Sequence, residues 1–211
     1  MRPNAVPPSS WARIVSGLTT GPQSLAAAFV GAAALSARRE TAAARPADKD
    51  DAGARAAFLE VYKVLMHPRC MHCHPSGDAP LQGDDSHMHA QNVKRGKDGK
   101  GKYALKCTNC HQDTNLPGEN MPPGNPTWHL PRRDLPLVFQ GKSPRELADQ
   151  LKDPRRNGGR ALEQLLEHVT HDKLVLWGWE PGDGRTKPPL SHDQFAKKFR
   201  EWVEKGAASP E

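Results

Sequence analysis

The chain has 211 residues, a formal net charge of +6 and only 36% hydrophobic residues. That share is low for a chain that must fill its own core, so disulfides, a metal or a large buried cofactor are expected to add order. Its 18 glycines and 20 prolines predict long turns and loops. The basic residues do not alternate with aromatic ones and no nucleic-acid-binding motif is visible, which argues against a DNA or RNA partner.

The N-terminal segment, residues 1–37, has the pattern of a secretory signal peptide. It contains Arg2 and Arg13 but no acidic residue, and it continues into an apolar run of small residues, 25–37, that is too short to span a bilayer. An uncleaved membrane anchor is the alternative. Residues 38–51 are polar and alanine-rich and are expected to form a flexible lead-in. No later stretch is apolar enough to cross a membrane, so a periplasmic mature chain without a membrane span is predicted.

Four helices are expected in the remaining residues, 52–211, because apolar side chains recur there at helical spacing. They cover about residues 52–66, 143–153, 160–170 and 191–205. Two of them begin with a capping box, at Ser143 and Ser191, and Gly206 stands where a C-terminal cap belongs.

Two long irregular stretches, 75–106 and 112–142, separate these helices. Loops of that length are uncommon inside a compact domain, and they fit a chain that wraps around a bound group. No alternating strand pattern of useful length is present. The expected fold is therefore a mostly α, loop-rich single domain, residues 52–211, wrapped around its cofactor.

All four cysteines lie in two C-x-x-C pairs, and a histidine follows each pair directly. The two motifs are Cys70, Cys73 and His74, and Cys107, Cys110 and His111. Two thiols at this spacing can form thioethers with the two vinyl groups of one haem, and the following histidine can supply an axial nitrogen to the iron. The sequence thus predicts two covalently bound haem c groups, with His74 and His111 as proximal ligands.

Other interpretations of the cysteine pairs fit less well. A zinc site built from two such pairs normally has about 12–20 residues between them, whereas here all of residues 74–106 intervene. A redox-active pair requires a βαβ context, which the sequence does not indicate. The secretory signal favours haem, because attachment of this kind occurs outside the cytoplasm.

The second axial position of each iron has many candidates. Eight further histidines and four methionines could serve: His67, His72, His87, His89, His129, His168, His171, His192, Met66, Met71, Met88 and Met121. His72 and Met71 lie inside an attachment loop, where geometry argues against this role. The number of spare histidines favours histidine over methionine, and two histidine ligands predict low-spin, low-potential haem.

Several segments resemble a family of bacterial dihaem c-type cytochromes, whose members are often labelled as an isoquinoline 1-oxidoreductase subunit. They are residues 67–75, 80–83, 95–96, 107–111, 128–130, 152–154, 157–159 and 174–179. The resemblance covers about residues 58–207. It implies that the distal ligands are among five histidines, namely His87, His89, His129, His168 and His171. This chain has Ser209 near the point where many members carry a further cysteine.

The family label implies an electron acceptor for a periplasmic molybdenum hydroxylase, although no residue here specifies that partner. The predicted function is electron transfer with a redox protein as partner, so an enzymatic activity is not the favoured expectation. A small peroxidase-like enzyme with one open iron and a haem-based sensor are the alternatives. A basic run from Lys94 to Lys102 is either a solvated loop or a docking patch for an acidic partner.

Overall fold

The computed structural model describes residues 49–211. The predicted signal peptide, residues 1–37, and nearly all of the predicted lead-in, residues 38–51, lie outside these described residues. The first helix, α1, spans Asp51–Leu65. It begins at Asp51 because the Asp50 side chain accepts a hydrogen bond from the backbone N–H of Gly53 at 2.8 Å and so caps the helix.

Three further helices of more than two turns follow, as predicted. They are α3 at Pro144–Lys152, α5 at Leu162–His171 and α7 at His192–Glu204. The two predicted capping boxes are present: the N–H groups of Glu146 and Gln194 each donate to the preceding serine hydroxyl, Ser143 or Ser191, at 3.2 Å. After α7 the chain turns at Gly206, whose φ of 97° is the left-handed conformation that closes many helices.

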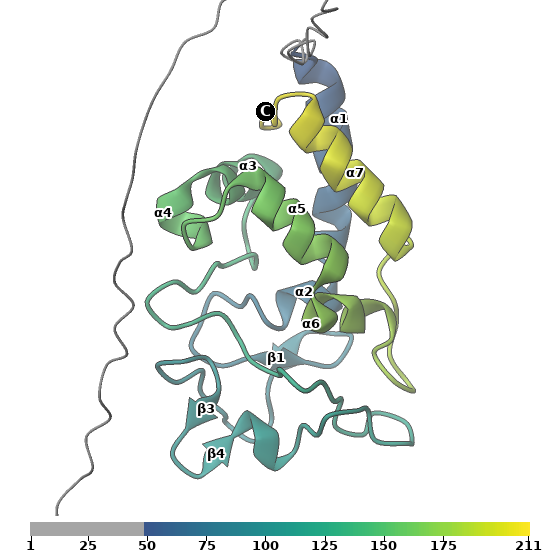
Figure 1. Cartoon of the computed structure of the whole chain (residues 1–211). Coiled ribbons are helices and arrows are strands. Elements are labelled where there is room, and N and C mark those ends of the chain that lie inside the picture. The colour runs from purple at the N-terminus through teal and green to yellow at the C-terminus, as the bar shows by residue number, and fades with distance from the viewer. Residues whose placement is uncertain (1–48) are drawn as a thin grey trace, which may run out of the picture. The chain divides into compact units, whose positions relative to one another are not determined.

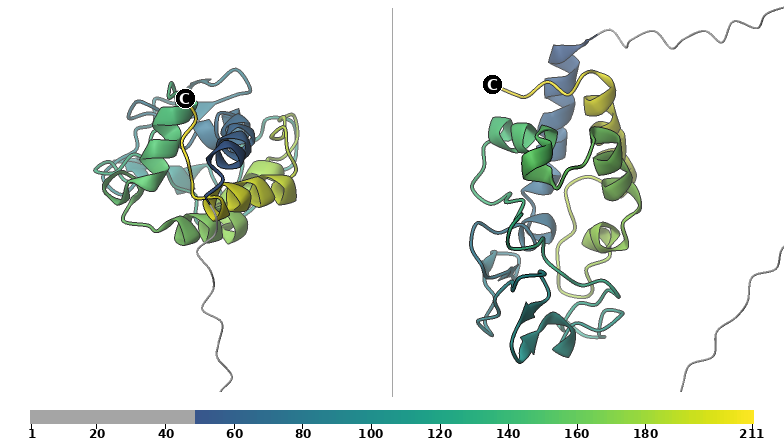
Figure 2. Two further views of the ribbon diagram at one scale, coloured as in Figure 1. Left: turned by 90° about the horizontal axis from the view of Figure 1, so that it is seen from above. Right: turned by 60° about the vertical axis from the view of Figure 1, so that its left-hand side comes forward.

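The helices bury a common apolar core. Helix α1 packs against α7 and α3, and α5 packs against the same two helices, as Figures 1 and 2 show from three directions. The core is rich in aromatic rings, and Phe58 of α1 lies 4.7 Å from Trp202 of α7, measured between ring centroids. Phe195 and Phe199 are buried beside them. The mostly helical, loop-rich character predicted for the chain is therefore confirmed.

Short elements were not predicted. One-turn helices form at α2 (Pro68–Met71), α4 (Pro154–Asn157) and α6 (Lys173–Leu176), and 3₁₀ turns at η1 (Cys107–Asn109) and η2 (Trp177–Trp179). Four strands of two residues form two antiparallel pairs. β1 (Leu81–Gln82) pairs with β2 (His87–Met88), and β3 (Gly101–Lys102) pairs with β4 (Leu105–Lys106). A helix of one turn or a strand of two residues is too short to produce a periodic apolar pattern, so the sequence does not indicate these elements.

A buried arginine holds the long loops together. Arg95 is 2% exposed. Its guanidinium donates to four backbone carbonyls, at 2.9 Å to Pro131, 3.3 Å to Pro136, 3.5 Å to Pro75 and 3.1 Å to Gly77. These acceptors come from both irregular stretches, which have few apolar side chains of their own. The hydrogen bonds of Arg95 therefore hold these loops together, a role that apolar side chains fill in a hydrophobic core.

Candidate cofactor sites

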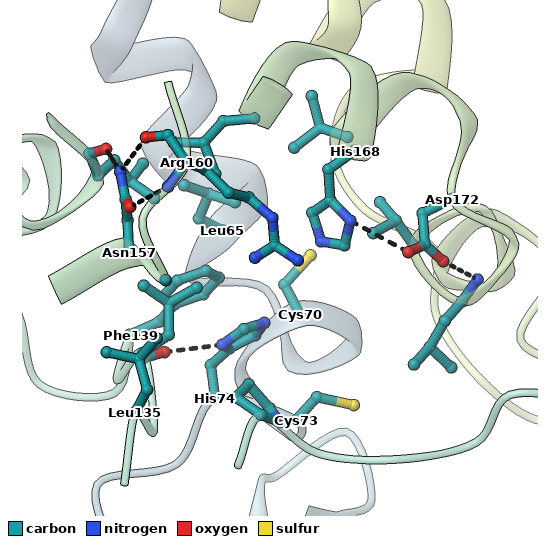
Figure 3. Close-up of a pocket in the computed structure, with 18 of the residues that line it drawn as sticks. Leu65, Cys70, Cys73, His74, Leu135, Phe139, Asn157, Arg160, His168 and Asp172 are labelled. Atoms are coloured by element: carbon teal, nitrogen blue, oxygen red, sulfur yellow. Dashed lines mark hydrogen bonds and ion pairs between the residues drawn. The ribbon is translucent and has the colours of Figure 1, made fainter. Parts of the chain in front are cut away.

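The first motif, residues 70–74, is called site 1 below, and the second, residues 107–111, is called site 2. Site 1 lines a cavity of about 660 Å³ where α2, α5 and the loops before and after α3 meet. This volume falls within the range of about 300–1,000 Å³ that is typical of cofactor and ligand pockets. Much of the lining is apolar, including Leu135, Phe139 and Leu165. Figure 3 shows the residues around it.

The His74 ring is fixed from two sides. Its Nδ1 donates a hydrogen bond to the carbonyl oxygen of Leu137 at 2.7 Å. Phe139 stacks on the ring, with centroids 3.8 Å apart and planes inclined by 11°. With Nδ1 occupied, the Nε2 edge of the ring is directed into the cavity (Figure 3). Burial lowers the pKa of His74 to about 3, so the imidazole is neutral, which is the form that binds a metal.

His168 lines the same cavity from α5. Its Nδ1 lies 3.1 Å from a carboxylate oxygen of Asp172, one helical turn further on, which again leaves Nε2 free. Burial lowers the pKa of His168, and Asp172 opposes that shift. In Figure 3 the His168 ring and the Arg160 guanidinium both extend toward the space above Cys70 and His74.

The position of Arg160 is set by a turn between α4 and α5. The Asn157 amide donates to the carbonyls of Leu151 at 2.7 Å and Arg160 at 2.9 Å, and its oxygen accepts from the Arg160 N–H at 2.9 Å. Gly158 and Gly159 both have positive φ, 89° and 76°. The Asn-Gly-Gly segment thus forms a tight turn that directs a cation toward the cavity mouth.

The site 1 cysteines are half-buried and are not joined as a disulfide. Burial raises the pKa of Cys70 to about 12 and that of Cys73 to about 11, and the neighbouring Cys107 contributes to the increase at Cys73. Redox-active C-x-x-C motifs have the opposite property, a lowered thiol pKa. Because Cys107 affects the pKa of Cys73, the first cysteine of site 2 lies close to the second cysteine of site 1. Site 1 does not have the lowered thiol pKa of a redox-active dithiol.

Site 2 repeats the arrangement of site 1 with different partners. His111 Nδ1 donates to the carbonyl oxygen of Pro123 at 2.7 Å. The ring stacks on Trp128, with centroids 4.3 Å apart and planes inclined by 10°. Burial lowers the pKa of His111 as well. Cys107 is buried but Cys110 is exposed, so site 2 reaches the surface of the described residues.

His89 lies opposite His111. Their ring centroids are 6.3 Å apart. Two imidazole rings that bind one metal ion from opposite sides, each with a metal–nitrogen bond of about 2 Å, have centroids roughly 6 Å apart. His89 Nδ1 is buried and has no hydrogen-bond partner among residues 49–211. A buried polar atom without a protein partner marks a place where a bound group can act.

The five predicted distal candidates thus separate into two groups. His168 and His129 line the site 1 cavity, and His89 faces site 2. The other two, His87 and His171, are exposed side chains whose Nδ1 atoms pair with Asp85 at 2.6 Å and Glu167 at 3.0 Å. His129 also has its Nδ1 bonded to the Thr127 carbonyl, and its neighbour Trp128 stacks on His111, so one short segment contacts both sites.

Sequence reasoning missed the residues that orient the two attachment histidines. They are the carbonyl groups of Leu137 and Pro123 and the rings of Phe139 and Trp128. A backbone carbonyl has no sequence signature. Trp128 had one usable signal, because it lies in a largely polar loop that has no other reason to contain a large ring, whereas Phe139 follows the apolar residues Leu137 and Val138 and had no such signal.

Two findings bear on the alternatives. Among residues 49–211, no group of three or more histidine, cysteine or acidic side chains is arranged to hold a metal ion by itself, so the four cysteines do not converge on a zinc site. Within the same residues, no helix combines the length and apolar character needed to cross a bilayer. Compared with protein-family models, curated proteins and solved structures, the chain gives no significant match.

Proposed function

We propose that the chain binds one haem c covalently at site 1 and one at site 2, and that it transfers electrons in the periplasm. The observation that carries this proposal is the pairing of histidines. His74 faces a cavity that His168 also lines, and His111 lies 6.3 Å from His89 between ring centroids. Two histidines at each site would hold one iron and leave it no open position, which suits an electron carrier.

Bound haem supplies the one-electron redox chemistry through its iron. The residues of the chain position and tune it. The carbonyl groups of Leu137 and Pro123 fix the two proximal imidazoles and increase their basicity. Arg160, directed toward the cavity at site 1, provides a positive charge for the propionate carboxylates of a bound haem. Apolar residues such as Phe139 and Leu165 line the site 1 cavity and would shield a bound haem from water.

The test begins with the full chain expressed together with a c-type haem attachment system and exported. We expect the intact mass of the mature chain to increase by two haem groups and the pyridine haemochrome spectrum to be that of haem c. Cys73→Ala and Cys110→Ala should each reduce the covalently bound haem at their own site. A chain that leaves the cell without haem, or that contains stoichiometric zinc, would show that the proposal is wrong.

The state of the irons then decides between electron transfer and catalysis. We expect two low-spin signals in the EPR spectrum of the oxidised protein and no spectral change when carbon monoxide is added to the reduced protein. A high-spin signal together with a carbon monoxide complex would instead indicate an open iron. That result would favour the peroxidase-like or sensor alternative.

A further inference from the structure

The β3–β4 hairpin is tied directly to site 2. Its strands pair Gly101 with Lys106, and the backbone N–H of Cys107 donates to the Lys100 carbonyl at 3.1 Å. The Asn109 side chain, inside site 2, donates to the carbonyl of Ala104 in the hairpin turn. Figure 1 shows the hairpin at the lower end of the view, well away from α7. A protein that binds the hairpin therefore lies next to site 2, whose Cys110 is exposed.

The hairpin exposes an aromatic ring at a backbone position that usually holds glycine. Tyr103 is the first residue of the two-residue turn between the strands, and its φ is 50°. Non-glycine residues in this region carry strain of about 1–3 kcal/mol, and hairpin turns favour glycine, asparagine or aspartate there. The Tyr103 side chain is nevertheless 92% exposed, and Leu105 next to it is 47% exposed. Neither side chain stabilises the fold by burial, so this exposed pair is suited to contact with another protein.

Lysines precede and follow the exposed pair along the chain. Lys97, Lys100 and Lys106 are exposed, and none of them forms an ion pair with a carboxylate of residues 49–211. The Nζ of Lys106 donates instead to a backbone carbonyl, that of Gly101, at 2.9 Å. The one acidic residue between Lys97 and Lys106 is Asp98. The surface therefore complements a carboxylate-rich face and repels a basic one.

We infer that this hairpin surface, defined as Lys97, Lys100, Tyr103, Leu105 and Lys106, docks the acidic face of a one-electron redox protein. The inference rests on the proposed function and adds the site and charge of the partner. The lysines steer the encounter, and Tyr103 with Leu105 forms the apolar centre of the contact. In the exchange the reduced partner would lose one electron and a haem held at site 2 would gain it, with no bond made or broken.

The kinetic test uses a reduced flavodoxin with a strongly acidic surface as the probe and the full holoprotein as acceptor. We expect the second-order rate of haem reduction to fall more than tenfold between ionic strengths of about 0.01 M and 0.15 M, where the Debye length shortens from about 30 Å to about 8 Å. K97E/K100E should lower the low-salt rate by at least tenfold and converge on the wild-type rate at higher salt. The matched control is K197E/R200E on α7, whose two residues are also exposed and which changes the net charge equally.

A second readout does not depend on electron transfer. Carbodiimide cross-linking of the two proteins, mapped by mass spectrometry, should join flavodoxin carboxylates to Lys97, Lys100 or Lys106. Y103G should weaken the cross-linking without lowering the stability of the chain, because glycine relieves the strained φ. Equal rate losses in K97E/K100E and in the α7 control, or cross-links spread evenly over the lysines, would overturn the inference. Failure of the proposed function would appear separately, as missing haem absorbance in the same samples.

Discussion

At the residue scale, His74 and His111 are held in the same way at the two C-x-x-C-H motifs. A backbone carbonyl accepts from Nδ1 of the attachment histidine at 2.7 Å in each case, and an aromatic ring stacks on the imidazole. The two sets of partners come from different loops, and the sequences around the motifs are not copies of one another. The shared arrangement fixes the tautomer and the ring plane of both imidazoles, which the haem binding proposed above would require.

The distal ligands can be tested by removing one histidine at a time. H168A should convert the haem at site 1 to a high-spin form that binds carbon monoxide, and H89A should do the same at site 2. Visible and EPR spectra measure both effects. H171A is the matched control, because His171 lies on the same helix as His168 but is exposed and paired with Glu167. If H129A and not H168A produces the high-spin form, His129 is the ligand at site 1.

The stability of the chain should depend on pH through His72. Burial lowers the pKa of His72 from 6.5 to about 4. Between these values the unfolded chain binds more protons than the folded one, so the free energy of unfolding rises with pH over this window and is fully present above about 6.5. The loss on acidification is about 3 kcal/mol at most. Urea unfolding at pH 7, 5.5 and 4.5 measures it.

The variant H72Q should reduce this pH dependence by the share of His72, because glutamine does not titrate, while the lowered pKa values of His74, His111 and His168 maintain the rest. H171Q serves as the control for removing an exposed histidine. Carboxylates such as Asp84, whose pKa is lowered, also destabilise the fold on acidification, but they act below about pH 4. A slope that is the same in H72Q and in the wild type would contradict the assignment.

At the element scale, the loops rely on close backbone approaches that only glycine permits. Gly99 has a φ of 81°, and its carbonyl accepts a hydrogen bond from the Leu130 N–H at 3.0 Å. A Cβ at Gly99 would collide with the Leu130 backbone. The stretch before site 2 and the segment after Trp128 are therefore held together at a point that has no room for a side chain.

Gly141 offers a matched comparison, since its φ is 77° and a Cβ there would meet nothing within 4 Å. G141A should cost about 1 kcal/mol of unfolding free energy, the strain of a left-handed alanine. G99A adds the collision and should cost roughly 3 kcal/mol or more. Urea denaturation of both variants gives the difference. Equal losses would mean that the loops can separate at Gly99 without cost.

At the scale of the whole molecule, the parts that were predictable from sequence are those set by local periodicity. The four longer helices and their caps follow from apolar spacing and from serine at two N-termini. The Arg95 hub was not predictable, because its acceptors are carbonyls far along the chain. Likewise, the motifs identify His74 and His111, but only the tertiary fold, which places α5 and α2 around one cavity, brings His168 to the cavity of His74.

The helices and the long loops also differ in how much apolar surface they bury. The helices α1, α3, α5 and α7 share a core of fully buried residues such as Phe58, Leu147 and Trp202. The stretches 75–106 and 112–142 add few buried apolar side chains, among them Leu81, Leu130 and Phe139. Two haems at sites 1 and 2 would supply the apolar surface that these stretches lack. If the proposed haems bind, we therefore expect the helices to form without them and the ordering of the loops to depend on them.

Hydrogen exchange of the mature chain with and without haem tests this dependence. We expect α1 and α7 to keep slow exchange in the haem-free chain, while residues 75–142 exchange at least tenfold faster than in the holoprotein. The haem-free form is best made by cytoplasmic expression without an attachment system, with unmodified cysteines. A double variant, C73A/C110A, exported in the usual way, controls for the compartment. Equal protection of residues 75–142 in both forms would show that Arg95 and the loop hydrogen bonds suffice, and that the low apolar content needs no haem to compensate for it.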